Sequence, residues 1–144
     1  MIAFTIPGVP VGKGRPRMKR AGHAFTPAKT RNAEAHVKLL AGQAMQGREP
    51  IAVPVHVAIE VECLIPQSWP RKKHALAVLN VLRPGKPDLD NVTKLILDAL
   101  NGVALVDDKQ VASIYATKKF GPVAQTKVQI TVLSTAREAE RTAA

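Results

Sequence analysis

The chain has 144 residues, of which 46% are hydrophobic and 3% aromatic, and its formal charge is +10. This length suits one domain with an aliphatic core, and the single cysteine excludes an internal disulfide and any metal site built from several cysteines. The charges near the N-terminus follow apolar residues, the reverse of a secretory signal, and no apolar run can span a membrane, so we expect a cytoplasmic protein with no membrane partner.

The first part of the chain predicts a strand, a basic loop and a helix. Residues 2–6 form a short apolar strand pattern. Residues 7–25 mix prolines and glycines with basic side chains, which is typical of an extended loop. Thr26-Pro27 is a helix start signal, and apolar residues then recur at helical spacing until Gly47.

A long alternating segment follows. Residues 53–65 place valines and isoleucines on one face, which predicts a half-buried strand with Cys63 in the core. Residues 71–79 can form a short helix after Ser68 and Pro70. Trp69 beside this helix is suited either to packing or to stacking on a DNA base.

The remaining elements complete the fold prediction. Residues 89–101 have apolar side chains on one helical face and end at Asn101-Gly102, a natural helix stop. Strands are expected over about 110–119 and 126–133, with a frayed tail from 136 to 144. We therefore predict a single domain of residues 1–144 in the α+β class, with a mixed β-sheet packed by two main helices.

Basic residues gather in two regions and predict a polyanionic partner. The first region, between 13 and 31, contains no acid, and the second leads from residue 71 towards 86. Nucleic acid is the default partner, because Lys and Arg contacts to phosphates release counterions and supply affinity. The residues expected to bind DNA are Lys13, Arg15, Arg17, Lys19, Arg20, Arg71, Lys72, Lys73 and Lys86.

All five aspartates nevertheless lie between residues 88 and 108. Asp88 and Asp90 fall at the start of the helix predicted over 89–101, where capping and the helix dipole already favour acids. Asp107 and Asp108 follow the helix in a segment predicted to be extended, so one of them can turn towards the helix start. Carboxylates about 5 Å apart repel by roughly 3 kcal/mol, and such a cluster requires a cation, for which Mg²⁺ fits best.

Two other carboxylate sites are set aside. An EF-hand loop starting at Asp88 would need Gly where Thr93 stands and Glu where Ala99 stands. A sugar-transferase manganese site would need a nucleotide-binding domain, and the chain has no Gly-rich turn between a strand and a helix.

The runs K-P-D-L-D-N-V-T-K, D-A-L-N-G and V-D-D-K-Q-V together resemble the signature of the RusA family of Holliday junction resolvases. V-G-K-G-R-P-R and F-T-P-A-K-T-R also resemble family members, so the likeness extends over about residues 1–120. The resemblance implies a homodimeric endonuclease that depends on Mg²⁺, with Mn²⁺ as a substitute. It would cut four-way DNA junctions by paired nicks, without a small-molecule cofactor.

The resemblance also implies the site residues. Asp88, Asp90 and Asp108 would bind the metal and act in catalysis with Lys94, while Asp98 lies outside this set. Whether Asp107 or Asp108 is the ligand stays open. Lys94 is one helical turn beyond Asp90, so it can reach a phosphate oxygen or orient water, or it can simply balance the charges of Asp90 and Asp98.

Two alternatives to a junction resolvase remain. A non-catalytic basic protein would bind nucleic acid without regard to Mg²⁺ and use its aspartates only as structure. A nuclease for other branched DNA would share the chemistry but prefer a different substrate.

Overall fold

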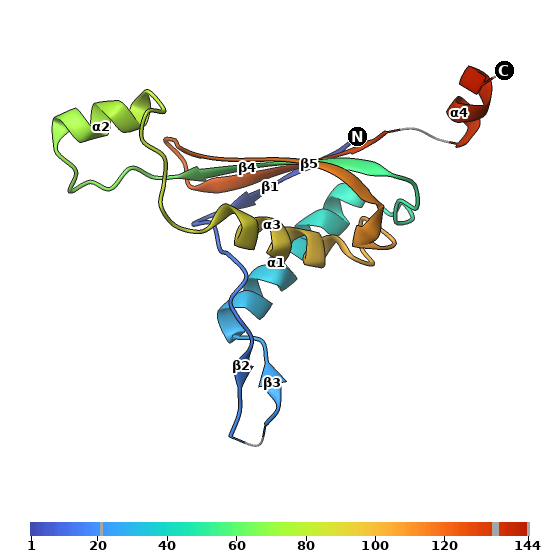
Figure 1. Cartoon of the computed structure of the whole chain (residues 1–144), viewed down its shortest axis with the longest axis horizontal. Helices are drawn as coiled ribbons and strands as arrows, with labels where there is room; N and C mark the ends of the chain where they lie inside the picture. The colour runs from blue at the N-terminus through green and yellow to red at the C-terminus, as the bar shows by residue number, and fades with distance from the viewer. Residues whose placement is uncertain (21, 134–135, 144) are drawn as a thin grey trace.

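The computed structural model describes residues 1–20, 22–133 and 136–143 of the chain. Four strands form one mixed sheet (Figure 1). β1 and β4 both run antiparallel to β6 between them, whereas β5 runs parallel to β4 at the edge. In their order across the sheet the strands are β1 (Ile2–Pro7), β6 (Gln125–Val132), β4 (Val55–Cys63) and β5 (Val111–Phe120).

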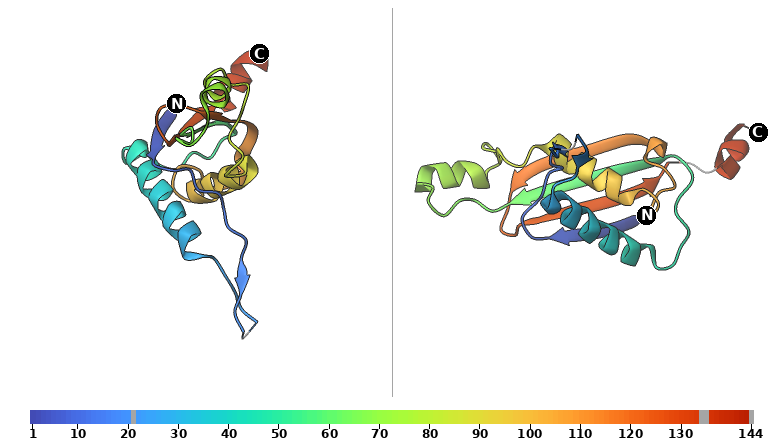
Figure 2. Two further views of the ribbon diagram at one scale, coloured as in Figure 1. Left: turned by 90° about the vertical axis from the view of Figure 1, so that its left-hand side faces the viewer. Right: turned by 90° about the horizontal axis from the view of Figure 1, so that it is seen from below.

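Two helices, α1 (Ala28–Met45) and α3 (Leu89–Leu100), lie together on one face of this sheet (Figures 1 and 2). They agree with the helices predicted after Thr26-Pro27 and over residues 89–101. The predicted α+β class, with two main helices on a mixed sheet in one domain, is therefore confirmed.

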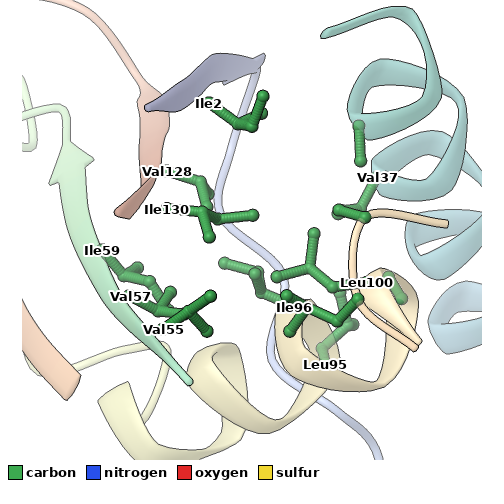
Figure 3. Close-up of a cluster of buried hydrophobic side chains, with 14 of the residues drawn as sticks. Ile2, Val37, Val55, Val57, Ile59, Leu95, Ile96, Leu100, Val128 and Ile130 are labelled. Carbon is green, nitrogen blue, oxygen red and sulfur yellow. The ribbon is translucent and has the colours of Figure 1, made fainter. Parts of the chain in front are cut away.

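The core fills the space between the sheet and the two helices (Figure 3). The alternation of β4 turns Val55, Val57, Ile59 and Val61 towards the helices, and each is at most 1% exposed. From α3, the buried residues are Val92, Leu95, Ile96, Ala99 and Leu100. Full burial of one aliphatic side chain contributes about 1.5–3 kcal/mol, so this face fixes the rotation of α3. The opposite face, which carries Asp90, Lys94 and Asp98, is consequently turned outward.

The short helix α2 (Arg71–Val78) extends beyond the end of the sheet (Figure 1). Beside it, the Trp69 ring packs edge-on against Phe120, with 5.3 Å between the ring centroids. The Lys73 ammonium lies 4.0 Å from the centroid of the Trp69 ring. Of the two roles predicted for Trp69, the structure therefore shows the packing role.

A two-stranded arm stands where the sequence predicts only a loop. β2 (Arg17–Met18) and β3 (Ala24–Phe25) pair antiparallel and project from the body of the molecule (Figures 1 and 2). Strands of two residues are too short to produce an alternating pattern, which is why the sequence does not reveal them.

Three further segments differ in detail from the predicted ones. Asp107 is extended as expected, but Asp108 begins the short 3-10 helix η1 (Asp108–Gln110). The helix α4 (Ala136–Ala143) stands where the sequence predicts a frayed tail. Cys63 packs at the edge of the core, and burial raises the pKa of its thiol.

No helix in residues 1–20, 22–133 and 136–143 has both the length and the apolar character needed to cross a membrane.

Candidate active site

The start of α3 presents two aspartates to solvent. Asp88 occupies the N-cap position with extended backbone angles (φ −65°, ψ 129°), but its carboxylate makes no capping hydrogen bond. A long contact joins it to Asn91, whose Nδ2 donates to Asp88 Oδ2 at 3.5 Å. Asp90 lies in the first turn, and neither acid forms an ion pair within the described part of the chain. Capping therefore does not explain Asp88, although the helix dipole favours both acids.

Lys94 is exposed one turn beyond Asp90. It forms no ion pair with Asp90 or with Asp98, all three being among the described residues. Asp98 pairs with Lys13 instead. The interpretation of Lys94 as a residue that balances two neighbouring acids thus finds no support in the contacts, and its ammonium group is available beside Asp90.

Lys13, a predicted phosphate contact, is paired with two acids. Its ammonium donates a hydrogen bond to the Asp98 carboxylate and lies 3.7 Å from Glu34 Oε1. The hydrogen bond to Asp98 is the main cause that raises the pKa of Lys13. This lysine ties the N-terminal segment to α3 and α1, and its role as a phosphate contact stays a prediction.

The glycines on both sides of Lys13 let this segment approach the helices closely. The Lys13 amide donates to the Asn91 carbonyl at 2.9 Å, and the Gly14 amide donates to Thr30 Oγ1 at 2.9 Å. A Cβ on Gly14 would come within 2.9 Å of the same hydroxyl oxygen. The G-K-G run is thus a packing device that fixes the base of the arm beside the start of α3.

A hollow of about 590 Å³ lies between the N-terminal segment around residues 9–15, the start of α1 and the Lys86-Pro87 turn. Arg15, Lys29 and Lys86 line it, and Lys86 lies two residues before Asp88. Lys29 is missing from the predicted contacts. Its position in the sequence could have indicated a role for Lys29. It lies in the first turn of α1, where the helix dipole disfavours a positive charge and no acidic residue offsets that charge.

The other predicted DNA contacts lie on the arm and on α2. Lys19 and Arg20 are exposed on the arm, and the Lys19 ammonium lies 5.7 Å from the Phe25 ring centroid. Arg71 and Lys72 are exposed on α2, where Lys73 covers the Trp69 ring. The side chain of Arg17 falls outside the described residues.

The second acidic pair lies in a tightly bonded turn. Asp107 caps η1, since its Oδ1 accepts a hydrogen bond from the Lys109 amide at 3.0 Å. This bond is the main cause that lowers the pKa of Asp107. Gln110 accepts from the Asp107 amide at 3.0 Å and donates to the carbonyls of Ile51 and Val53 at 2.6 and 2.8 Å.

Asp108 is presented by this framework. Its amide donates to Asn101 Oδ1 at 2.7 Å, and its carboxylate forms no ion pair among the described residues. Because the Asp107 carboxylate is engaged in the cap, Asp108 is the better candidate ligand of the two. The signature residues Asn101, Asp107 and Gln110 then have a structural explanation, namely to hold the turn around Asp108.

The two sets of acids lie at opposite ends of α3. Asp88 precedes the helix, whereas Asn101, which binds the Asp108 amide, follows it. Twelve helical residues at 1.5 Å each give a length of about 18 Å. Consistently, no group of three or more His, Cys, Asp or Glu side chains within the described ranges could hold a metal ion.

The donors at the start of α3 nevertheless suit Mg²⁺. Asp88 and Asp90 are exposed carboxylates without a competing cation among the described residues. Mg²⁺ is commonly held by one or two carboxylates together with retained waters and substrate phosphates. The residues present therefore fit this ion, and neither cysteine nor histidine is needed.

Comparison with known proteins places the chain in a family. The family model for the endodeoxyribonuclease RusA matches residues 7–131, a range that includes the arm, α3 and η1. The uncharacterized protein YqaN of Bacillus subtilis (strain 168) is 36% identical over 139 residues, covering 92% of this chain and 97% of YqaN. With its acids, its basic arm and its framework residues inside the matched range, the chain belongs to the RusA endodeoxyribonuclease family.

Proposed function

We propose that the protein is a cytoplasmic, Mg²⁺-dependent endonuclease that resolves four-way DNA junctions by paired, symmetric nicks. The observation that carries this proposal is the start of α3, where Asp88, Asp90 and Lys94 are exposed and take part in no ion pair among the described residues. In a chain of charge +10, two neighbouring exposed acids without a cationic partner leave their oxygens available to a bound cation.

The metal ligands in this proposal are Asp88, Asp90 and Asp108, with Mn²⁺ able to replace Mg²⁺. Asp88 and Asp90 lie at the start of α3, whereas Asp108 is bonded to Asn101 beyond its end, and the helix is about 18 Å long, which disfavours one ion held by all three acids of one chain. We infer a homodimer in which Asp88 and Asp90 of one copy lie beside Asp108 of the second. Twofold symmetry then creates two equivalent sites, as symmetric nicking requires.

The bound ion would neutralise charge on the scissile phosphate and lower the pKa of an attacking water. Lys94 would donate to a phosphate oxygen, which stabilises the charge that develops as water adds to phosphorus and the bond to the leaving sugar oxygen breaks. The exposed position of Lys94 near Asp90 allows both groups to face the same phosphate.

The DNA would be held by basic residues on both sides of the site. Arg15, Lys29 and Lys86 line the hollow beside Asp88, with Lys19 and Arg20 on the arm. Arg71 and Lys72 on α2 add positive charge. Such contacts position the strand without reading its sequence, so the preference for a branched substrate would come from shape.

The test is cleavage of a synthetic four-way junction labelled in each arm, with Mg²⁺ or EDTA, beside a linear duplex of the same sequence. An Asp90→Asn variant is run in parallel. We expect symmetric nicks on the junction alone, lost both in EDTA and in the variant.

Other outcomes identify the alternatives. Junction binding without a cut in any divalent metal would leave a non-catalytic nucleic-acid-binding protein. Metal-dependent cutting of flaps or forks in preference to the junction would keep the chemistry and change the substrate.

A further inference from the structure

The segment that leads into Asp88 is bound to the edge strand β5. The Lys118 ammonium donates to the carbonyls of Gly85 and Pro87 at 3.2 and 3.1 Å. In return, the Arg83 guanidinium donates to the Lys118 carbonyl at 3.1 Å. Lys118 is therefore the residue through which β5 holds residues 83–87.

Lys118 occupies an unusual place for a lysine. It pairs with buried Val61 in the register of β4 and β5, so its side chain points to the helix-covered face of the sheet. A charge on this face is costly unless its donors are bonded. No carboxylate pairs with Lys118 in the described ranges, and its ammonium binds the two main-chain carbonyls. These contacts thus serve the segment and do not balance an acid.

The Pro87 carbonyl belongs to the peptide unit that contains the Asp88 nitrogen. Because that unit is planar, a bond to its oxygen restrains the position of the Asp88 Cα and the direction of its side chain. Asp88 has no capping bond of its own to restrain it. Besides the long contact from Asn91 Nδ2 at 3.5 Å, the orientation of its carboxylate consequently depends in part on the segment before it.

We propose that Lys118 is a positioning residue that holds Asp88 in the geometry needed for metal binding. This rests on the proposed function, because it assigns Lys118 a role towards the same site. A purely electrostatic role would have the opposite effect, since a nearby positive charge repels a cation. Removing Lys118 would then strengthen metal binding, whereas losing the restraint on Asp88 weakens it.

The variant is Lys118→Met, which keeps the aliphatic stem and removes the donors. Lys119→Met is the matched control, because Lys119 is the next residue on β5, points to the other face and pairs with Glu60. Both remove one positive charge. The probe is Mn²⁺ alone, with binding to the DNA-free protein followed by electron paramagnetic resonance. Hydrogen exchange of the amides at Gly85, Lys86 and Asp88 is measured as well.

We expect Lys118→Met to weaken Mn²⁺ binding about tenfold to a hundredfold, the usual effect of removing a residue that supports a metal ligand. Amide exchange over residues 85–88 should become faster. Lys119→Met should change neither quantity, and Lys118→Arg, which retains donors, should recover part of the binding. Should Lys118→Met not fold, Lys118→Leu, which also lacks a donor, serves in its place.

Mn²⁺ binding that is unchanged or tighter in Lys118→Met would overturn the inference while leaving the proposed function intact, provided the unaltered protein binds Mn²⁺ and cuts junctions. If the unaltered protein does neither, the proposed function falls, and the role of Lys118 with it.

Discussion

Two aspartates stand at N-cap positions in this chain, and their carboxylates are used differently. Asp107 accepts a hydrogen bond from the Lys109 amide within a capping box, whereas the carboxylate of Asp88 caps nothing. An N-cap side chain typically stabilises a helix by about 1 kcal/mol, and Asp88 does not contribute this stabilisation to α3. The contrast separates an acid with a structural role from one that is free for a ligand.

We predict that Asp107→Ala lowers stability, whereas Asp108→Ala lowers junction cleavage. Asp107→Ala should lower the melting temperature, because η1 loses its cap, whereas Asp108→Ala should leave it unchanged. Asp108→Ala should instead reduce junction cleavage about a hundredfold or more, since it removes a proposed ligand. Thermal unfolding and cleavage of each variant are measured together. Normal cleavage by Asp108→Ala would exclude it as a ligand and point to Asp107.

The pH dependence of the melting temperature provides a control for the effect of Asp107→Ala. The amide of Lys109 lowers the pKa of Asp107 below the ordinary value of 3.8. A lowered pKa in the folded state means that the stabilisation is present above the ordinary value and lost as pH falls through the folded one. The difference in melting temperature between the unaltered protein and Asp107→Ala should therefore shrink in strong acid. A difference that persists there would come from something other than the ionised cap.

At the scale of the elements, sequence patterns predicted the sheet strands and α1 to α3, and missed the two-residue strands of the arm. α3 was predictable because its apolar residues repeat at helical spacing, and β4 because its valines alternate. The arm has two residues in each strand and no such pattern. Asp88 and Asp90 were candidates from the gathering of all five aspartates between residues 88 and 108 and from the family motif. The hydrogen bonds from Lys118 to Gly85 and Pro87 span more than thirty positions, which no local pattern encodes.

The sequence also could not predict the distance between the acids at the start of α3 and those that follow the helix. Spacing along the chain does not say whether a turn after a helix folds back towards its start. Here the Gly102 amide donates to the Leu105 carbonyl at 2.7 Å, and Asn101 binds the Asp108 amide. These bonds keep the second acidic pair at the far end of α3.

The basic side chains of the arm are predicted to bind DNA phosphates. A double variant, Lys19→Gln with Arg20→Gln, should weaken junction binding and make it less sensitive to salt. Removing one bond between a basic side chain and a phosphate reduces the slope of log K against log salt by about 0.9. Binding is measured in EDTA over a range of salt concentrations. Lys127→Gln, on the sheet face opposite the helices, should leave the slope unchanged. An unaltered slope in the double variant would exclude the arm as a site of phosphate binding.

For the whole molecule, the length of α3 links DNA cleavage to the formation of the proposed dimer. A rotation axis that brings Asp108 of one copy to Asp90 of a second also brings the second copy's Asp108 to the first copy's Asp90. In the proposed dimer, the two sites would therefore form together or not at all. A monomer would then be inactive even though each of its acids is present, which links cleavage to dimer formation and limits nicking to substrates that reach both sites.

This arrangement predicts complementation between inactive chains. Asp90→Asn and Asp108→Asn should each be inactive alone, but refolding them together should restore nicking. In a mixed dimer one site then carries both substitutions and the other carries none. Random pairing makes half of the dimers mixed, each with one intact site, so about a quarter of the original number of sites should return.

The matched control is a mixture of Asp90→Asn with Asp88→Asn. These two acids belong to the same chain's half of a site, at the start of one α3, so each site of a mixed dimer would still lack a ligand. Nicking of a labelled junction is measured for both mixtures at equal total protein. Recovery with the first mixture and none with the second is expected. Failure of both, with dimers verified by light scattering, would mean that each site draws its acids from one chain, which would require α3 or the turn around Asp108 to rearrange when DNA binds.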